Sequence, residues 1–277
     1  MPHGIKALST PQDVTKFAVA AEEGGWDGFF VWDNLGQAMG DTTVLLSSFA
    51  IHTKKIKFGA MVMGVPKRRP WKLAKELITI DLLSEGRLIF GAGIADPIFY
   101  EKFGEETDAK IRAEKLDEAL EIINNFMSGE EVNFSGKHYT VNGVRYKSSV
   151  QTPRVPIWIG GFWPIKGPFK RGARWGGMIP HTMRVKKDEL AILSPEEVEE
   201  SMKFIKELRN GDSGNFDYVM LNPLPDDENQ RVELVEKYHK LGVSWWVDSV
   251  YEWKEFDREM DDLDPLIEKL KAGPPEY

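Results

Sequence analysis

The fold is decided by one short stretch, residues 70–93, which reads PWKLAKELITIDLLSEGRLIFGAG. Proline at the first helical position is favourable, and apolar residues then recur at helical spacing as far as Leu83. A short apolar run, Arg87 to Gly91, follows and predicts a buried strand. A helix that leads directly into a buried strand is the building unit of a parallel sheet covered by helices.

The same alternation of helices and short apolar strands continues along the chain in both directions. Helix starts are marked by N-cap residues, as at Thr10, Asp41 and Ser194. Helices are predicted at residues 10–24, 41–52, 70–83, 108–127, 168–175 and 226–241, and one more begins at residue 194. Seven strands are predicted, at residues 27–32, 56–62, 87–91, 155–159, 178–179, 216–221 and 244–247. Residues 132–139 interrupt the rhythm with a turn signal at Ser135 to Lys137, which predicts a hairpin outside the main sheet.

Seven strands of this kind are one short of an eight-stranded barrel. We therefore predict an α/β fold, a (β/α)8 TIM barrel with insertions, formed by residues 1–277 as a single domain. Only Met1 to Ser9 precede the first helix. Either Ile5 to Leu8 forms a poor first strand or the first strand is missing or truncated, and an open barrel would expose strand edges.

Composition excludes several classes of function. The chain has 36 basic and 44 acidic residues, a net charge of −8, and no basic stripe, which weighs against nucleic acid as a partner. It contains no cysteine, so disulfides, thiolate nucleophiles and iron–sulfur clusters are excluded. No membrane-spanning run or signal peptide is present in the sequence, and we expect a cytoplasmic protein without a membrane partner.

Common catalytic motifs are also absent. The dinucleotide pattern G-x-G-x-x-G begins at Gly91 but fails at Asp96, where the third glycine would stand. The sequence has no Walker-type phosphate loop and no G-x-S-x-G. Its five histidines lack metal-ligand spacing, so no metal site is predicted.

The remaining candidates cluster where the strands end, because a barrel carries its chemistry at the carboxyl ends of its strands. Glycines there allow a flat ligand to approach the backbone, and aromatic or methionine side chains supply apolar walls. Barrel packing is an alternative explanation for Trp32 and Met61, and Asp33 could simply cap the following loop. The candidates are Trp32, Asp33 and Asn34, then Met61, Val62, Met63 and Gly64, then Gly91, Ala92 and Gly93, then Gly160 and Gly161, and finally His181.

Several of these segments resemble the luciferase-like, flavin-dependent monooxygenases. The resemblance is carried by residues 21–33, 66–76, 80–93, 103–107, 112–120, 155–161 and 173–175, and by residues 242–246 and 272–275 for one subgroup. The segments follow one another in order over nearly the whole chain. Two departures stand out: Asn34 replaces the histidine frequent in the family, and residues 94–96 lack the glutamate of many deazaflavin dehydrogenases.

The resemblance implies a (β/α)8 barrel that binds reduced FMN or a 5-deazaflavin of the coenzyme F420 type at its strand ends. It implies that residues 32–34, 61–64 and 91–95 surround the flavin ring. It also implies a phosphate site between Gly161 and the following helix, in a connection that includes Phe162. A helix N-terminus offers free N–H groups to a phosphate, so Lys166 and Gly167 are the predicted contacts. The neighbouring cations Lys170 and Arg171 are equally typical of a solvated helix face.

From this resemblance we expect a monooxygenase that uses reduced FMN and molecular oxygen on a small organic substrate. A deazaflavin-dependent hydride-transfer enzyme and a non-catalytic flavin-binding protein are the alternatives. Asp33, Asn34 and His181 are the candidates for polar positioning or proton transfer, with His181 expected to titrate near neutral pH unless it is a structural residue. A separate flavin reductase is a possible partner, and nine tryptophans favour a homodimer.

Overall fold

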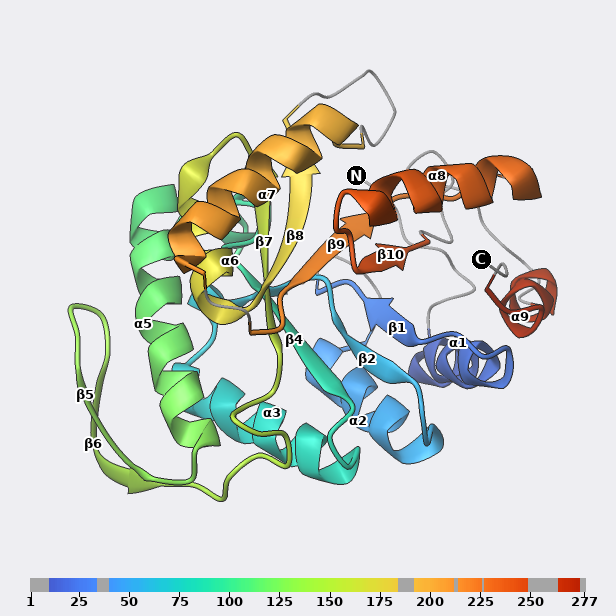
Figure 1. Ribbon diagram of the computed structural model, residues 1–277. Coiled ribbons are helices and arrows are strands. Elements are labelled where there is room, and N and C mark those ends of the chain that lie inside the picture. The colour runs from blue at the N-terminus through green and yellow to red at the C-terminus, as the bar shows by residue number, and fades with distance from the viewer. Residues whose placement is uncertain are drawn as a thin grey trace.

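The computed structural model describes residues 10–33, 40–183, 192–211, 214–225, 227–248 and 264–274. Its main feature is a curved sheet in which the strands follow one another as parallel neighbours (Figure 1). Seven strands form this path in the order β1 (Gly28–Val31), β2 (Lys57–Ala60), β4 (Leu88–Gly93), β7 (Ile157–Trp163), β8 (Gly177–Thr182), β9 (Asp217–Leu221) and β10 (Trp245–Val247). The two-residue strand β3 (Met63–Gly64) pairs with β4 off this path.

Helices cover the outer side of the sheet (Figure 1). The longer ones are α1 (Pro11–Glu23), α2 (Thr42–His52), α3 (Pro70–Leu83), α5 (Ala109–Met127), α6 (Lys166–Trp175), α7 (Pro195–Arg209), α8 (Glu228–Lys240) and α9 (Asp264–Lys271). Two short helices, η2 (Val65–Lys67) and α4 (Ile98–Glu101), lie within the connections that follow β3 and β4. The predicted N-caps are confirmed, and Ser194 forms a full capping box with Glu197.

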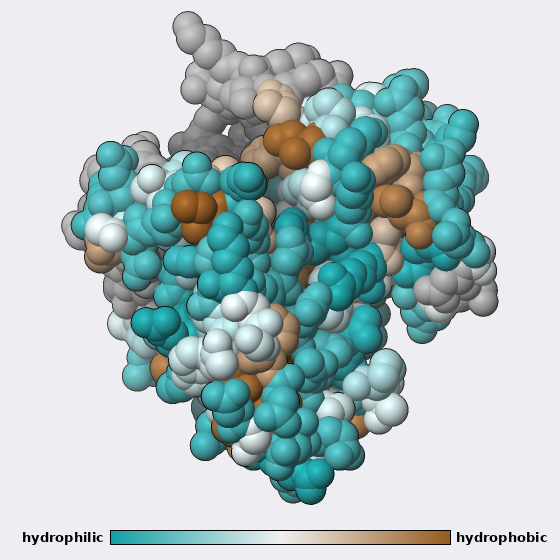
Figure 2. Space-filling model, turned by 90° about the vertical axis from the view of Figure 1, so that its left-hand side faces the viewer, coloured by the Kyte–Doolittle hydropathy of each residue, from teal (hydrophilic) through white to brown (hydrophobic). Residues whose placement is uncertain are grey.

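The predicted hairpin is confirmed as β5 (Glu131–Ser135) and β6 (Thr140–Arg145), which form a separate two-stranded sheet. Its turn is attached to α5 by two carboxylates, those of Glu114 and Glu118. Glu118 accepts the backbone N–H groups of Lys137 at 2.7 Å and Tyr139 at 3.0 Å. The face that carries α5 and the hairpin is mostly hydrophilic, with brown apolar patches scattered among teal (Figure 2). In the described part of the chain, no helix combines the length and apolarity that crossing a membrane requires.

The predicted alternation of elements is confirmed, but several strand boundaries were wrong. The strand predicted at 56–62 ends at Ala60, and the chain resumes pairing only at Met63. Three other strands run further than predicted, to Gly93, Trp163 and Thr182. Glycine, proline and polar residues at these ends look like loop signals, yet parallel pairing with the neighbouring strand continues through them. Helix α6 begins at Lys166, two residues earlier than predicted.

The sheet is a curved wall whose edge strands, within the described residues, are β1 and β10. The predicted position of a first strand, residues 5–8, lies outside the described residues. Large rings fill the space inside the curve. The ring centroids of Phe30 and Trp158 are 5.4 Å apart, and those of Trp158 and Trp245 are 5.3 Å apart. Phe30 and Trp245, from the two edge strands, are separated by 6.1 Å.

Glycines make room for these rings: Gly177 is on the strand next to Trp158, and Gly28 is on the same strand as Phe30. A Cβ at Gly177 would lie 2.2 Å from Cδ1 of Trp158, and one at Gly28 would lie 2.8 Å from a Phe30 ring carbon. Neither distance is compatible with the present packing, because close-packed interiors leave no slack of this size. Inside this sheet, large rings therefore lie against residues without side chains.

We expect Gly177→Ala to lower the free energy of unfolding by about 1–3 kcal/mol, since the new methyl group would overpack against the Trp158 ring. Gly167→Ala is the control, because a Cβ there meets nothing within 4 Å. The control should stay within about 1 kcal/mol of the wild type. Urea unfolding of the three proteins measures both effects, and equal stability of the two variants would contradict this packing.

Candidate active site

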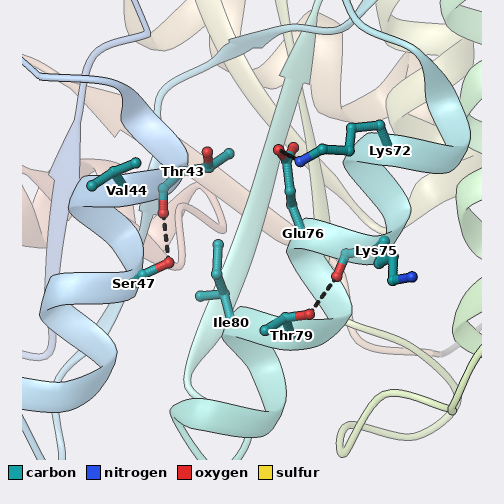
Figure 3. A pocket seen from close by; sticks show the side chains of 8 residues that line it. All are labelled: Thr43, Val44, Ser47, Lys72, Lys75, Glu76, Thr79 and Ile80. Atoms are coloured by element: carbon teal, nitrogen blue, oxygen red, sulfur yellow. Dashed lines mark hydrogen bonds and ion pairs between the residues drawn. The ribbon is translucent and has the colours of Figure 1, made fainter.

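Cavities on the outer surface do not coincide with the strand ends. One, of about 220 Å³, is a groove between α2 and α3 whose lining includes Thr43, Ser47, Lys72 and Glu76 (Figure 3). Another of about 220 Å³ is lined by residues of α7 together with Gly214 and Phe216. Neither is lined by a residue at the carboxyl end of a strand, so the strand ends are described from their own contacts.

Val62 occupies the centre of the predicted site. It follows β2, and its side chain turns toward the glycines of β4 and β7. A Cβ at Gly93 would lie 2.7 Å from a Val62 methyl carbon, one at Gly160 would lie 3.1 Å away, and one at Gly91 3.3 Å. The space that these glycines leave, predicted to admit a flat ligand, is thus partly filled by Val62. The Val62 side chain itself is only half-buried, so it forms a floor that a ligand can reach.

The other predicted residues near this floor divide by the side of the sheet that they face. Met61 is half-buried and packs with Val62 on the interior cluster of Ile89 and Trp158. Met63 and Ala92, by contrast, are buried in the main core, so their side chains serve packing. Trp32 is half-buried directly after β1, and Asn34 lies outside the described residues.

Two predicted glycines have packing partners on the outer side of the sheet. A Cβ at Gly161 would lie 2.2 Å from Pro168, so this glycine allows α6 to approach β7 closely. A Cβ at Gly64 would lie 3.0 Å from both the Tyr100 hydroxyl and the Lys67 side chain. Gly64 also donates its N–H to Oδ2 of Asp33 at 2.9 Å. Both glycines are therefore explained by the packing of the protein itself.

Asp33 is the centre of a buried charge cluster. Its carboxylate pairs with Arg68 at 2.6 Å and Lys67 at 3.2 Å, and it accepts the Thr42 hydroxyl at 2.8 Å. The carboxylate side chain is only 3% exposed. Burial alone would raise the pKa of Asp33, but the charges of Arg68 and Lys67 and the hydrogen bonds hold it below its usual value. Burial lowers the pKa of Lys67 despite the attraction of Asp33.

These contacts favour a positioning role for Asp33 over proton transfer, because the carboxylate stays ionised and fully engaged. The cluster connects the end of β1 to the start of α2 and to η2, which precedes α3. Asp33 was predicted from the sequence, but neither of its cationic partners was. The signal was present in the consecutive cations Lys67, Arg68 and Arg69, which follow a predicted strand end.

A second buried group that sequence analysis missed lies beside the end of β4. Arg112 of α5 is 2% exposed and donates to the carbonyl oxygens of Ile94 at 2.9 Å and Ala95 at 2.7 Å. Its guanidinium lies 5.1 Å from the ring centre of Tyr100. The Tyr100 hydroxyl is buried without a hydrogen-bond partner in the described part of the chain, and burial raises its pKa. Arg112 thus fixes the loop that borders the Val62 floor.

His181 lies on β8 opposite Phe162 of β7, and the two ring centres are 5.4 Å apart. Burial lowers the pKa of His181 to about 4. The prediction that His181 titrates near neutral pH was therefore wrong, since its imidazole is neutral at pH 7. The sequence could not show this, because the desolvation arises from the packing of two strands.

The predicted phosphate contacts lie at the start of α6. The N-cap, Ile165, has no side chain to bond the first N–H groups, and Gly167 is exposed with open space around its α-carbon. The Lys166 ammonium lies 3.5 Å from the ring centre of Trp163 and 4.4 Å from that of Phe204. Its charge is thus directed at two aromatic rings.

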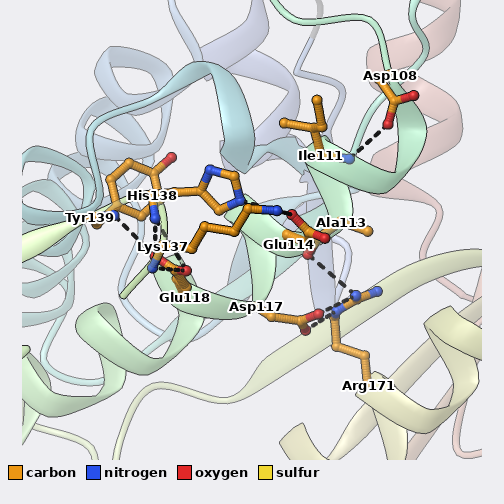
Figure 4. Close-up of polar contacts among 10 residues, drawn as sticks. All are labelled: Asp108, Ile111, Ala113, Glu114, Asp117, Glu118, Lys137, His138, Tyr139 and Arg171. Atoms are coloured by element: carbon orange, nitrogen blue, oxygen red, sulfur yellow. Dashed lines mark hydrogen bonds and ion pairs between the residues drawn. The ribbon is translucent and has the colours of Figure 1, made fainter. Parts of the chain in front are cut away.

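Arg171 binds a carboxylate of a neighbouring helix and does not extend into solvent. It binds Asp117 of α5 through two hydrogen bonds, at 2.6 and 2.8 Å, and so joins α6 to α5 (Figure 4). Among the described residues, no group of three or more histidine, aspartate or glutamate side chains is arranged to hold a metal ion.

The cluster around Asp33 gives the protein a stability that depends on pH. Because the pKa of Asp33 is lower in the folded state than in the unfolded chain, its contribution is present above about pH 4 and is lost as the pH falls through the folded-state pKa. We expect Asp33→Asn to cost about 3 kcal/mol at pH 7, since it leaves Lys67 and Arg68 buried without their counter-ion. The variant should also lose less stability than the wild type between pH 5 and 3.

The control is Glu130→Gln, which removes an exposed ion pair to Arg145. It should change the free energy of unfolding by less than about 1 kcal/mol. Chemical unfolding at each pH gives both quantities. A cost at Asp33 no larger than that at Glu130 would contradict the assignment of a buried charge cluster.

Proteins of known function resemble parts of this chain. An F420-dependent glucose-6-phosphate dehydrogenase of Microbacterium testaceum is 30% identical over 172 residues, which are 58% of this chain and 51% of that protein. A 5,10-methylenetetrahydromethanopterin reductase of Archaeoglobus fulgidus is 28% identical over 140 residues, 50% of this chain and 40% of that protein. The chain thus spans about half the length of the curated relatives that it matches.

Solved structures show the same fold. The coenzyme F420-dependent tetrahydromethanopterin reductase of Methanopyrus kandleri superposes with a TM-score of 0.65 at 22% identity, covering 83% of this chain and 69% of that one. The oxygenating constituent of 3,6-diketocamphane monooxygenase of Pseudomonas putida, solved with FMN, gives a TM-score of 0.63 at 19% identity, covering 86% and 69%. The family model for luciferase-like monooxygenases matches residues 2–165. With more than half of its length matched and the curved parallel sheet in place, the chain belongs to the luciferase-like monooxygenase family.

Proposed function

We propose that the protein is a flavin-dependent oxidoreductase that binds its cofactor ring over Val62. The proposal is supported mainly by the floor that Val62 forms among glycines. Gly91, Gly93 and Gly160 have no side chains that could rise around it, so a flat ring can lie against the half-buried valine. Half-buried Met61 and Trp32 near the same strand ends extend an apolar surface suited to such a ring.

The cofactor phosphate is assigned to the start of α6. The first helical N–H groups lack a side-chain cap there, and the helix dipole adds positive potential. Gly167 has open space on its surface side, which gives a phosphate access to the backbone. Lys166 contributes positive potential nearby, although its ammonium faces Trp163. This assignment retains Lys166 and Gly167 as the proposed contacts.

A bound flavin supplies the redox chemistry, and the chain supplies binding, orientation and exclusion of water. Asp33 holds the ends of β1 and β3 together beneath the site through Gly64. Neutral His181 presents a ring nitrogen that can donate to, or accept from, a polar atom of the substrate. For the chemistry itself, we propose oxygenation of a small organic molecule with reduced FMN and molecular oxygen.

A deazaflavin-dependent hydride transfer is the second candidate. It is favoured by the names of the curated relatives, several of which are F420-dependent dehydrogenases. A flavin-binding protein without catalysis is a third possibility that the same floor supports. Which of the three applies depends on the cofactor bound and on its reactivity with oxygen.

Titration of the full chain with FMN, riboflavin and coenzyme F420 tests the proposal, followed by oxygen consumption with reduced FMN. We expect micromolar binding of FMN and consumption of oxygen. Binding of F420 with no effect on oxygen would select hydride transfer. Failure of all three ligands to bind would overturn the proposal.

Gly167→Asp tests the phosphate assignment separately. An aspartate in the first turn suits the helix but repels a phosphate, so FMN affinity should fall at least tenfold, about 1.4 kcal/mol. Riboflavin, which has no phosphate, is the control and should bind as before. Equal weakening of both ligands would place the phosphate elsewhere.

We also propose a cytoplasmic homodimer served by a separate flavin reductase. Support for the dimer comes from apolar side chains on the outer helices, since Val44 and Ile51 of α2 are 61% and 57% exposed and Leu83 of α3 is 48% exposed. Val44 also lines the groove of Figure 3. Light scattering should give twice the 31.5 kDa of the chain. A single species of 31.5 kDa at micromolar concentration would reject the dimer.

A further inference from the structure

Exposed apolar side chains gather where β7 and β8 end. Phe162 is 50% exposed, Ile165 is 49% exposed and Met183 is 58% exposed. Single exposed apolar residues are common on protein surfaces, but these lie at or just after the ends of two adjacent strands, and the Phe162 ring lies 5.4 Å from the ring of His181. Phe162 pairs in register with His181, and Met183 follows His181 by two residues. We call Phe162, Ile165, His181 and Met183 the rim.

The rim stands above the Val62 floor on the inner side of the sheet. Alternate residues of a strand face the same side, and Trp158 of β7 and Ile179 of β8 belong to the interior cluster. Phe162 is four residues after Trp158, and His181 is two residues after Ile179. Both side chains therefore face the interior, as those of Trp158 and Ile179 do. Gly160, against which Val62 packs, is two residues before Phe162. A molecule held by the rim would therefore lie next to a ring on the floor.

The rim carries no fixed charge. His181 is neutral at pH 7, and the remaining rim side chains are apolar. The nearest described cation in sequence, Lys166, directs its ammonium at Trp163, whose buried ring belongs to the core on the outer side of β7. Arg171 and Arg174 are paired with carboxylates of α5. An anion thus finds no partner among the rim side chains, and the neighbouring N-terminus of α6 is assigned to the FMN phosphate, so a second charged ligand would lose solvation there.

We propose that the rim binds an uncharged, apolar ring of the substrate against Phe162, with one polar atom of the substrate hydrogen-bonded to His181. This inference deepens the proposed function and rests on it. If the flavin ring lies on the Val62 floor, the neighbouring rim is where a substrate would contact it. The substrate class is a neutral aromatic or alicyclic compound with a carbonyl or hydroxyl group. A sugar phosphate, named for several curated relatives, does not match the rim.

Two probes that share one ring system, one neutral and one charged, test the substrate class. Methyl 2-naphthoate and 2-naphthoate share one ring system, and their binding to the full chain is measured at pH 7.5 by fluorescence titration, with and without saturating FMN. We expect the neutral ester to bind at least tenfold more tightly than the carboxylate. Equal or tighter binding of the carboxylate would overturn the proposal.

Variants then locate the binding. Phe162→Ala should weaken the ester five- to tenfold, whereas Phe103→Ala, at a phenylalanine that is 58% exposed elsewhere, should leave it unchanged. His181→Phe keeps a ring but removes the polar atoms. It should weaken the ester at least threefold and leave 2-methylnaphthalene, which has no carbonyl, unaffected. Circular dichroism verifies folding, and Phe162→Leu replaces Phe162→Ala if the alanine variant does not fold.

The outcomes separate the two proposals. Equal losses in the Phe162 and Phe103 variants, or no loss at Phe162, would overturn the rim even if FMN binds normally. Selective ester binding that depends on Phe162, together with no binding of any flavin, would support the rim as an apolar site and overturn the proposed function. Selective binding in both the presence and absence of FMN supports the two together.

Discussion

Large side chains inside the curved sheet lie against glycines of the neighbouring strands, and this interlocking determines the site above it. Deeper inside the sheet, below the strand ends, Trp158 fits against Gly177. At the carboxyl ends of the strands, Val62 fits against Gly91, Gly93 and Gly160. A Cβ at Gly177 or Gly93 would clash with its neighbour, and one at Gly160 or Gly91 would require Val62 to shift by a few tenths of an ångström. The same fit that fills the interior therefore leaves the half-buried side chain of Val62 accessible at the strand ends.

The charge cluster of Asp33 complements this apolar fit. Packing sets how closely the strands approach one another. A carboxylate held by two cations and a backbone N–H also fixes the relative orientation of the segments that carry these groups. Burying such charges costs free energy of solvation. The cluster nevertheless lies buried where β1, β3 and η2 meet. Next to this cluster, Arg112 anchors the loop after β4 through two backbone carbonyl groups. The floor is thus bordered by segments that are each held by a buried cation.

Much of this architecture was predictable from local patterns. Helix caps at Thr10, Asp41 and Ser194 and the apolar strand runs depend on residues close together in sequence, and the structure confirms them. The glycines at the strand ends were also identified. What fills the space beside them was not predictable, because Val62 and Gly160 meet only when two strands are brought together.

The remaining differences have the same origin in long-range contacts. The cationic partners of Asp33, Lys67 and Arg68, are more than 30 residues away in the chain, and Arg171 meets Asp117 across two helices. His181 loses its ordinary pKa because of desolvation by tertiary packing, which no local sequence pattern reports. The ends of β4, β7 and β8 extend beyond the prediction because pairing with a neighbouring strand overrides the weak β propensity of glycine and proline.

Nuclear Overhauser effects between the ligand and methyl-labelled protein show whether a flavin ring lies on Val62, as proposed. With FMN bound, this account predicts contacts from the flavin ring protons to the Val62 methyl groups. Ile80, which lines the groove between α2 and α3, should show none. Contacts to Ile80 with none to Val62 would contradict the account, because the flavin would then occupy the outer groove instead of the strand ends.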